Sequence, residues 1–369
     1  MKSLDDVLVV SLEQAVAAPY CSRLLAEAGA RVIKLERPGG DFARHYDTVV
    51  NGESAYFVWL NAGKESLEID LKNDDEKALL KRLLAKADVF IQNIRPGALS
   101  KLGFDESTLN AINPQLVVCN ISGYGEDGDF ADKKAYDFLV QAESGLVSVT
   151  GPPDSPSRVG ISVCDISTGL TAYSEILRAL IERDQTGVGK ALDISLFGVM
   201  SEWMSVPLVY YKNGGKLLGG TGVDHAQISP YGVHQAADGP FIIAVQHNGE
   251  WKNLCDKVLN RPELVDDPKF KNNPERVENR TEVTAAIEAV TGQLTRKEVA
   301  KLMESAGIAY GDLNNCADVW DHPALQTKTV NSQGKSATFV RRVCDDGNQP
   351  RNLPALGQHS ENIRAEFSE

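Results

Sequence analysis

The N-terminal half of the chain alternates short apolar runs with helical segments, and this alternation constrains the fold more than any other feature. Strands that alternate with helices form mainly parallel sheets with helices on both faces. The pattern therefore predicts an α/β fold with a Rossmann-like parallel sheet. The predicted strands are Val7–Val10, Arg31–Glu36, Ser66–Asp70, Val89–Gln92, Leu116–Cys119 and Ala191–Leu196, and the main predicted helices are Ala17–Ala28, Asp74–Ala87 and Ile166–Arg183.

A change in composition after about residue 200 predicts a second, smaller domain. Glycines cluster at 214–222, and clustered glycine is typical of a linker. A predicted strand at Phe241–Val245 is then followed by charged helices, which indicates an α+β module. The expected division is a large α/β domain over 1–200 completed by 325–369, a linker over 201–230 and a small domain over 231–324.

Charge and cysteine usage exclude several classes of protein. A net charge of −13 disfavours nucleic acid and anionic membranes as partners. No apolar run reaches the roughly 18 residues of a membrane span, and the N-terminus does not resemble a signal peptide. The 6 cysteines stand singly, without the spacing of a zinc site. We therefore expect a cytoplasmic protein with reduced thiols, no metal and no permanently bound cofactor.

The glycine-rich segments do not match a phosphate-binding motif. The first βα turn, Ser11–Pro19, lacks the glycines that a dinucleotide-binding fold needs there. Gly123–Gly128 lacks the Lys-Ser/Thr of a P-loop. An open parallel sheet still exposes its loops at the carboxyl ends of the strands, where a nucleotide-like ligand can bind.

Four segments, taken in order and spacing, resemble class III CoA-transferases and the related alpha-methylacyl-CoA racemases. They are Ile33–Asp41, Gln92–Gly97, Ala135–Asp137 and Gly160–Gly169. The resemblance extends over essentially the whole chain, to the ending Ala355–His359. It implies coenzyme A as a co-substrate, acyl-CoA and small carboxylic acids as substrates, and an interlocked homodimer.

The resemblance places the catalytic nucleophile at Asp165, immediately before a predicted long helix. Backbone N–H groups and the helix dipole favour an anion at that position. A carboxylate can form a mixed anhydride and then a thioester, which divides one difficult exchange into easier steps. The alternative is that Asp165 only caps the helix.

The resemblance also implies a set of binding residues at the ends of the strands. Cations can hold the phosphates of the coenzyme, and the residues predicted for this are Arg37, Lys64, Arg95 and Lys134. Asn93 is expected to contact the coenzyme, and the amide of Gln14 is expected to face the acyl group. Gly219–Gly222 is either a mobile loop over the reaction centre or a simple linker.

One residue distinguishes transfer from racemisation. Racemisation needs an acid/base group on each face of the substrate, and the racemases that this chain resembles have a histidine where Tyr136 stands. A tyrosine phenol ordinarily ionises only near about pH 10, so Tyr136 is better suited to orienting a substrate. We predict a CoA-transferase; a racemase or epimerase and a CoA-binding protein without turnover remain alternatives.

The acceptor acid is predicted by resemblance alone. The chain looks most like the branch that handles small dicarboxylates such as itaconate, mesaconate or succinate. A dicarboxylate requires a second cation near the acyl pocket, and Arg44, His45 and His225 are the residues predicted to supply it.

Overall fold

The computed structural model describes residues 3–343, 345 and 351–368. The chain divides into two units, which are described separately below. The first consists of Met1–Leu146, Arg158–Leu208 and Gln326–Glu369, and the second consists of Val147–Ser157 and Val209–Leu325.

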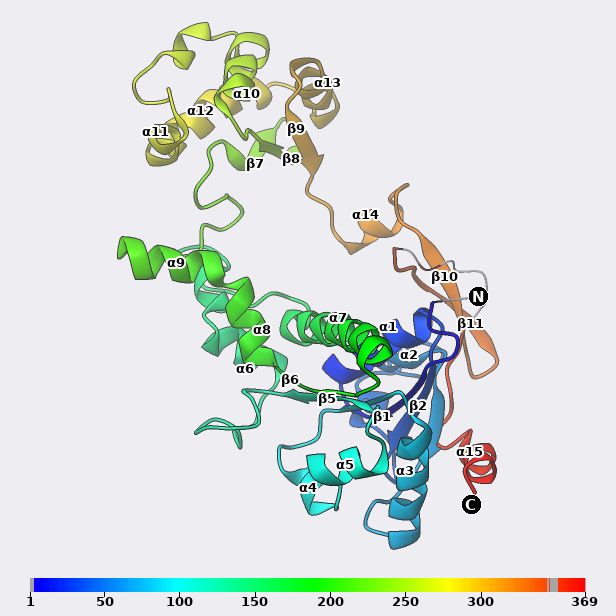
Figure 1. Cartoon of the computed structure of the whole chain (residues 1–369). Coiled ribbons are helices and arrows are strands. Elements are labelled where there is room, and N and C mark those ends of the chain that lie inside the picture. The colour runs from blue at the N-terminus through cyan, green and yellow to red at the C-terminus, as the bar shows by residue number, and fades with distance from the viewer. Residues whose placement is uncertain (1–2, 344, 346–350, 369) are drawn as a thin grey trace. The chain divides into compact units, whose positions relative to one another are not determined.

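A six-stranded sheet forms the centre of the first unit, in the order β3-β2-β1-β4-β5-β6 (Figure 1). Every neighbouring pair is parallel, which confirms the predicted parallel sheet. The order reverses between β1 and β4, and ligands of open α/β sheets bind in the crevice at such a reversal. The strands are β1 (Leu8–Leu12), β2 (Arg31–Glu36), β3 (Glu65–Glu68), β4 (Val89–Gln92), β5 (Val117–Ser122) and β6 (Ala191–Ser195).

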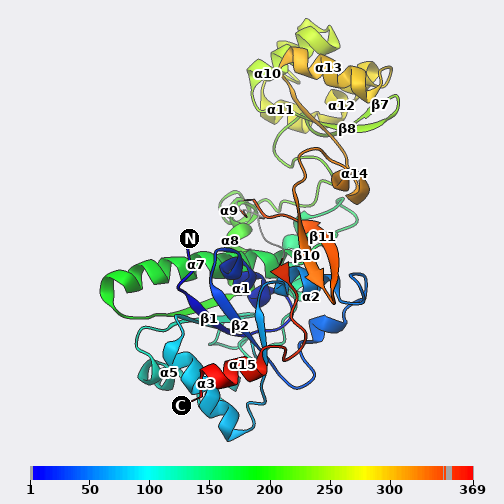
Figure 2. The ribbon, with the colours of Figure 1, turned by 90° about the vertical axis from the view of Figure 1, so that its right-hand side faces the viewer.

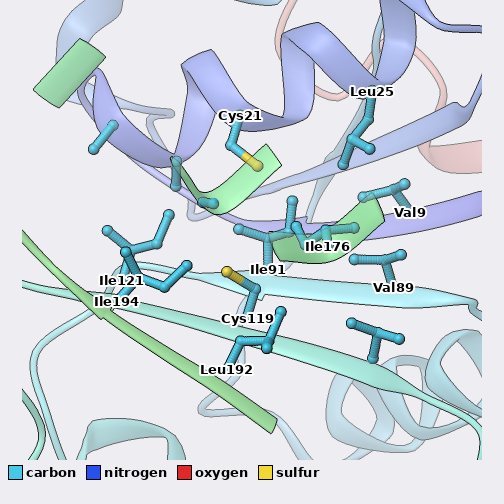
Figure 3. Packing of buried hydrophobic residues seen from close by; sticks show 14 of the residues in the cluster. Val9, Cys21, Leu25, Val89, Ile91, Cys119, Ile121, Ile176, Leu192 and Ile194 are labelled. Atoms are coloured by element: carbon cyan, nitrogen blue, oxygen red, sulfur yellow. The ribbon is translucent and has the colours of Figure 1, made fainter. Parts of the chain in front are cut away.

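Helices cover both faces of this sheet, because its strands are apolar on both sides. In β4, Val89 and Ile91 pack in one core cluster and Phe90 packs in the other, as the alternation of side chains along a strand requires. Figure 3 shows Cys21 of α1 and Ile176 of α7 lying over the first of these faces. The covering helices are α1 (Ala17–Glu27) and α7 (Val163–Thr186) on one face, and α3 (Asp74–Lys86), α4 (Ala98–Lys101) and α5 (Glu106–Ile112) on the other.

Shorter elements connect the strands of the first unit or continue the chain into the second unit. They are the 3-10 turns η1 (Phe42–His45) and η2 (Leu146–Val149), together with α2 (Ala55–Asn61), α6 (Asp137–Glu143), α8 (Leu196–Trp203) and α9 (Ser205–Gly214). The end of α8 and the whole of α9 occupy residues that were predicted as the start of a linker.

The C-terminal segment returns to the first unit and protects the outer edge of β3 (Figure 2). Helix α15 (Ser360–Glu366) places Ile363 in the core cluster beneath the sheet. The backbone N–H of Ser66 in β3 donates to Nδ1 of His359 at 3.1 Å. An exposed strand edge invites pairing with other chains. The C-terminal segment covers this edge and so prevents such pairing. A small sheet of β10 (Thr327–Ser332), β11 (Lys335–Val340) and β12 (Arg351–Asn352) precedes it.

The second unit has its own antiparallel sheet and its own core. The strand predicted at Phe241–Val245 is β8, and the strands on either side of it were not predicted. Trp251, Ile287 and Met303 are buried in its core. The elements are β7 (Tyr231–Ala236), β8 (Gly239–Ala244), β9 (Ala309–Asp312), α10 (Asn248–Asn253), η3 (Leu254–Leu259), η4 (Pro262–Val265), α11 (Asn273–Glu278), α12 (Arg280–Thr291), α13 (Arg296–Ala306) and α14 (Cys316–Trp320). None of the helices in the described part of the chain has the length and apolar character needed to cross a membrane.

Helices α1 and α7 approach closely at Gly169, and this contact gives a test of the fold. A Cβ at Gly169 would lie 2.5 Å from the carbonyl oxygen of Ala17 and 3.1 Å from Cβ of Tyr20. Since backbone cannot yield as a flexible side chain can, we expect Gly169→Ala to lower the free energy of unfolding by about 1–3 kcal/mol. Gly214→Ala is the control, because nothing lies within 4 Å of that position. Equal denaturation midpoints for the two variants would contradict this account of the contact.

Candidate active site

A pocket of about 530 Å³ lies at the carboxyl ends of β1, β4 and β5. Loops that follow these strands form much of its wall, and the start of α7 contributes Asp165. The pocket therefore occupies the crevice at the strand reversal. Of the predicted site residues, those that line it are Gln14, Asn93, Arg95, Lys134, Tyr136 and Asp165.

Asp165 lies in the first turn of α7, not immediately before the helix as predicted, because α7 begins at Val163. Ser162 at the N-cap position makes no side-chain capping bond. The capping oxygen comes from Asp137, whose Oδ1 accepts from the backbone N–H of Cys164 at 2.8 Å and of Asp165 at 3.4 Å. No hydrogen bond to the Asp165 carboxylate itself is found among the described residues, so this carboxylate is free to react.

The environment of Asp165 makes its carboxylate unusually basic. Burial, and then repulsion from Asp137, raise the pKa of Asp165 from 3.8 to about 7. Asp137 is itself buried, and its Oδ2 accepts from Nε2 of Gln141 at 2.7 Å. A carboxylate with a raised pKa is a better nucleophile and marks a candidate functional site.

An aromatic wall of Phe42, Tyr46 and Tyr56 faces the same pocket. The rings of Tyr46 and Tyr56 meet edge to face, with their centroids 5.9 Å apart. Burial raises the pKa of Tyr46 to about 12, with contributions from nearby carboxylates that include Asp165. Tyr46 therefore remains a hydrogen-bond donor at neutral pH. Sequence reasoning missed this wall, because its only signal was a position shortly after the second predicted strand.

Asn93 joins the two loops on either side of the strand reversal. Its Oδ1 accepts from the backbone N–H of Gln14 at 2.9 Å, and its Nδ2 donates to the carbonyl of Gln14 at 2.9 Å. The next residue, Ala15, has a φ of 62°, and such backbone strain is typical of functional loops. The amide of Asn93 thus positions Gln14, while its predicted contact with the coenzyme stays a prediction.

Lys64 belongs to a buried ion cluster and does not line the pocket. Its Nζ donates to Glu13 at 2.7 Å, to Asn61 at 2.9 Å and to the carbonyl of Pro19 at 3.1 Å. Burial lowers the pKa of Lys64 to about 8 although Glu13 opposes this. Because the ammonium already has three protein acceptors, we leave Lys64 out of the coenzyme site proposed below.

The same cluster includes Lys34, whose Nζ lies 2.9 Å from Asp41 and 3.4 Å from Glu13. Burial alone would raise the pKa of Glu13, but the ammoniums of Lys64 and Lys34 lower it to about 2. The ion pairs of Lys34 and Lys64 with Glu13 and Asp41 thus form beneath the turn that follows β1. Nothing in a single-sequence pattern marks a lysine inside a strand as part of such a cluster.

The other predicted residues occupy different places. Arg37 is exposed outside the pocket, where its Nε donates to the carbonyl of Gly40 at 3.2 Å. Arg95 is exposed at the pocket and pairs with Asp132 at 3.0 Å. In the second unit, the backbone N–H of Gly220 donates to the carbonyl of Ser148 at 3.1 Å, and the role of Gly219–Gly222 as a mobile loop or a linker stays a prediction. Among the described residues, no group of His, Cys, Asp and Glu side chains could hold a metal ion.

A pocket at the strand reversal of an open parallel sheet is where α/β folds bind nucleotide-like ligands, and a carboxylate with a raised pKa in such a pocket marks a candidate enzyme site. The chain matches the family model of CoA-transferase family III over residues 4–360. It belongs to this family, which confirms the predicted class of enzyme.

Known relatives match almost the whole chain. It is 33% identical to succinyl-CoA:glutarate CoA-transferase of Mus musculus, over 99% of this chain and 86% of the relative. It is 34% identical to acetyl-CoA:oxalate CoA-transferase of Acetobacter aceti, over 99% of this chain and 95% of the relative. The crystal structure of a CAIB/BAIF family protein from Brucella suis matches with a TM-score of 0.83 and 35% identity, covering 100% of both chains.

The raised pKa of Asp165 predicts a pH-dependent gain in stability for Asp165→Asn. In the folded protein the carboxyl binds its proton up to about pH 7, and its ordinary value is 3.8. The folded state therefore holds more protons than the unfolded state between these values, and the ionised carboxylate costs stability above them. We expect Asp165→Asn to gain about 1–2 kcal/mol at pH 8, since partial exposure reduces the full effect.

The measurement is denaturant unfolding of both proteins from pH 4 to pH 8. The gain should shrink steadily as the pH falls toward 4, because the folded carboxyl is then protonated and the unfolded one is becoming so. Asp154→Asn, an exposed position, serves as the control and should show no such dependence. A gain for Asp165→Asn that is equal at pH 4 and pH 8 would contradict the raised pKa.

Proposed function

We propose that this enzyme moves coenzyme A between small organic acids, with dicarboxylates as acceptors and Asp165 as the covalent nucleophile. The observation that supports this best is a basic carboxylate without a hydrogen-bond partner, in the pocket at the strand reversal. The relatives named for glutarate and oxalate transfer support the choice of acceptor.

The proposed cycle begins when the carboxylate of Asp165 attacks the thioester carbonyl of the donor. The C–S bond breaks, CoA leaves as the thiolate, and a mixed anhydride remains. The thiolate then attacks the carbonyl carbon of Asp165, releasing the donor acid and forming an aspartyl-CoA thioester. An acceptor carboxylate reverses both steps and regenerates Asp165. No water is consumed, so the pocket must exclude it.

Each attack creates an oxyanion that needs hydrogen-bond donors. We assign this role to the amide of Gln14 and the hydroxyl of Tyr136, which line the same pocket. Tyr46 adds a third donor, because its raised pKa keeps the hydroxyl protonated. Arg95 and Lys134 are the cations of the pocket wall that we assign to the phosphates of the coenzyme.

The racemase alternative lacks a second acid/base group in this pocket. No histidine is among the described residues that line it, and Tyr136 stands at the position where the racemases have one. A CoA-binding protein without turnover would not need a basic nucleophile, whose burial costs stability.

Covalent trapping tests the nucleophile. We expect incubation with succinyl-CoA to give a coenzyme-sized adduct on Asp165 by peptide mass spectrometry, and Asp165→Ala to lower CoA transfer to glutarate by at least about a thousandfold. Asp132→Ala removes another carboxylate of the pocket wall and should retain the adduct. An adduct on a different residue would refute this mechanism, and α-proton exchange in deuterated water without transfer would favour the racemase.

We extend the proposal to a cytoplasmic homodimer, as the family resemblance implies. The described cysteines are all free thiols, which fits a reducing compartment. Helices α8 and α9 expose large apolar side chains, and exposed apolar patches mark interaction surfaces. They include Trp203, Val206, Leu208, Val209 and Tyr211.

A dimer of the 40.1 kDa chain should appear by light scattering after gel filtration. Val206→Asp places a charge in the apolar surface of α9, so we expect it to shift the protein toward monomer or aggregate. Lys212→Glu changes the charge of an exposed residue on the same helix and should leave the dimer intact. A wild-type mass equal to that of one chain would refute the proposed dimer.

A further inference from the structure

A dicarboxylate acceptor presents two anions, and within the first unit neither Arg44 nor His45, which were predicted to bind the second one, is a free cation of the pocket. Arg44 pairs with buried Glu36 at 2.7 Å. His45 does not line the pocket. His225 lies in the second unit, where its ring stacks on Tyr231. A cation that can hold the far carboxylate must be sought elsewhere on the pocket wall.

The cations that line the pocket are Arg95, Lys133, Lys134 and Arg158. Arg95 pairs with Asp132 at the exposed rim and is assigned above to the coenzyme, and Lys133 pairs with Glu143. Arg158 forms no ion pair with any described carboxylate. Its Nε donates to the carbonyl of Val159 at 3.2 Å, and its guanidinium lies 5.3 Å from the ring centroid of Phe138.

This arrangement leaves both terminal nitrogens of Arg158 free. Two parallel N–H groups match the two oxygens of a carboxylate, whereas the ammonium of Lys134 acts as a point charge without that geometry. The ring of Phe138 restricts the guanidinium by cation–π contact. Arg158 is therefore the cation of the pocket wall best suited to recognise a carboxylate.

A buried glutamine links the backbone next to Arg158 to the start of α7. Oε1 of Gln141 accepts from the backbone N–H of Val159 at 2.9 Å, and its Nε2 donates to Asp137 at 2.7 Å. Asp137 in turn caps α7 at the turn that carries Asp165. Since Gln141 is fully buried, the segment of Arg158 and the first turn of α7 are held by one side chain. The backbone next to Arg158 is thereby tied to the turn that carries Asp165, which places the guanidinium and the carboxylate on one pocket wall.

We propose that Arg158 selects the acceptor by binding the far carboxylate of a dicarboxylate while the near carboxylate attacks the thioester on Asp165. This inference rests on the proposed function. It assigns Arg95 and Lys134 to the coenzyme and Arg158 to the acid, so that the cations of the pocket are divided between two substrates.

The test compares glutarate with its half-amide, which keeps the reacting carboxylate and removes the far charge. Wild-type enzyme should prefer glutarate in kcat/KM by roughly 10- to 100-fold, the effect of one charge-assisted hydrogen-bonded pair. In Arg158→Gln the preference should fall to nearly one, through a higher KM for glutarate. The KM for succinyl-CoA should change by less than about threefold. Arg158→Lys should restore part of the preference.

Arg95→Gln is the matched control, because Arg95 is also an exposed arginine of the pocket. It should raise the KM for succinyl-CoA and leave the preference for glutarate over the half-amide unchanged. If Arg158→Gln instead raises the KM for succinyl-CoA, Arg158 is a coenzyme ligand and the inference is wrong. An unchanged preference in Arg158→Gln also overturns it. Failure of the proposed function is distinct, because wild-type enzyme would then transfer CoA to neither acid.

Discussion

The geometry of the pocket depends on a buried ion cluster beneath the ends of β1 and β2. Glu13 and Asp41 face the ammoniums of Lys34 and Lys64, all nearly inaccessible to water. Two anions balance two cations, so the cluster as a whole is neutral. Removal of one partner would leave an uncompensated buried charge, which costs about 3–5 kcal/mol. Asp41 also accepts from the backbone N–H of Ala15 at 3.2 Å, and this bond holds the strained turn that presents Gln14 to the pocket.

Another buried carboxylate, Asp137, orders the pocket wall at the start of α7 and acts on Asp165, the proposed nucleophile. As the cap of α7 it satisfies backbone N–H groups at the helix start. Because it lies so close, its charge also raises the pKa of Asp165. One residue thus stabilises the helix and destabilises the ionised nucleophile that the helix presents. Ionisation of the buried Asp165 carboxylate lowers the stability of the fold. The capping bonds and the packing of α1 against α7 offset this loss.

The sequence predicted the sheet well because its strands are buried on both faces. Arg31–Glu36 and Val89–Gln92 agree with β2 and β4 in every residue. A short apolar run identifies β4, and Val32, Ile33 and Leu35 mark β2 although charged residues interrupt it. The start of α7 was misplaced because its cap, Asp137, is 28 residues distant from Asp165, beyond any local capping pattern. Lys64 was expected at the coenzyme for a related reason: its burial follows from partners that the fold brings together. The prediction that Asp165 is the nucleophile came from family resemblance, because composition and spacing alone do not distinguish a nucleophile from a cap.

The charge of Asp165 changes during the proposed cycle, and this change orders the binding of the two acids. While Asp165 is ionised beside Asp137, a second carboxylate in the pocket meets like charge, which disfavours it. Conversion of Asp165 to a thioester removes its charge, so that only Asp137 of these two neighbouring carboxylates can repel an anion. The repulsion between the pocket and an acceptor with two negative charges is then weaker. Arg158 offers this acceptor a guanidinium that has no ion pair with a described carboxylate. Acceptor binding is thereby favoured after the donor acid has left, so the electrostatics of the pocket themselves impose the sequence of the exchange.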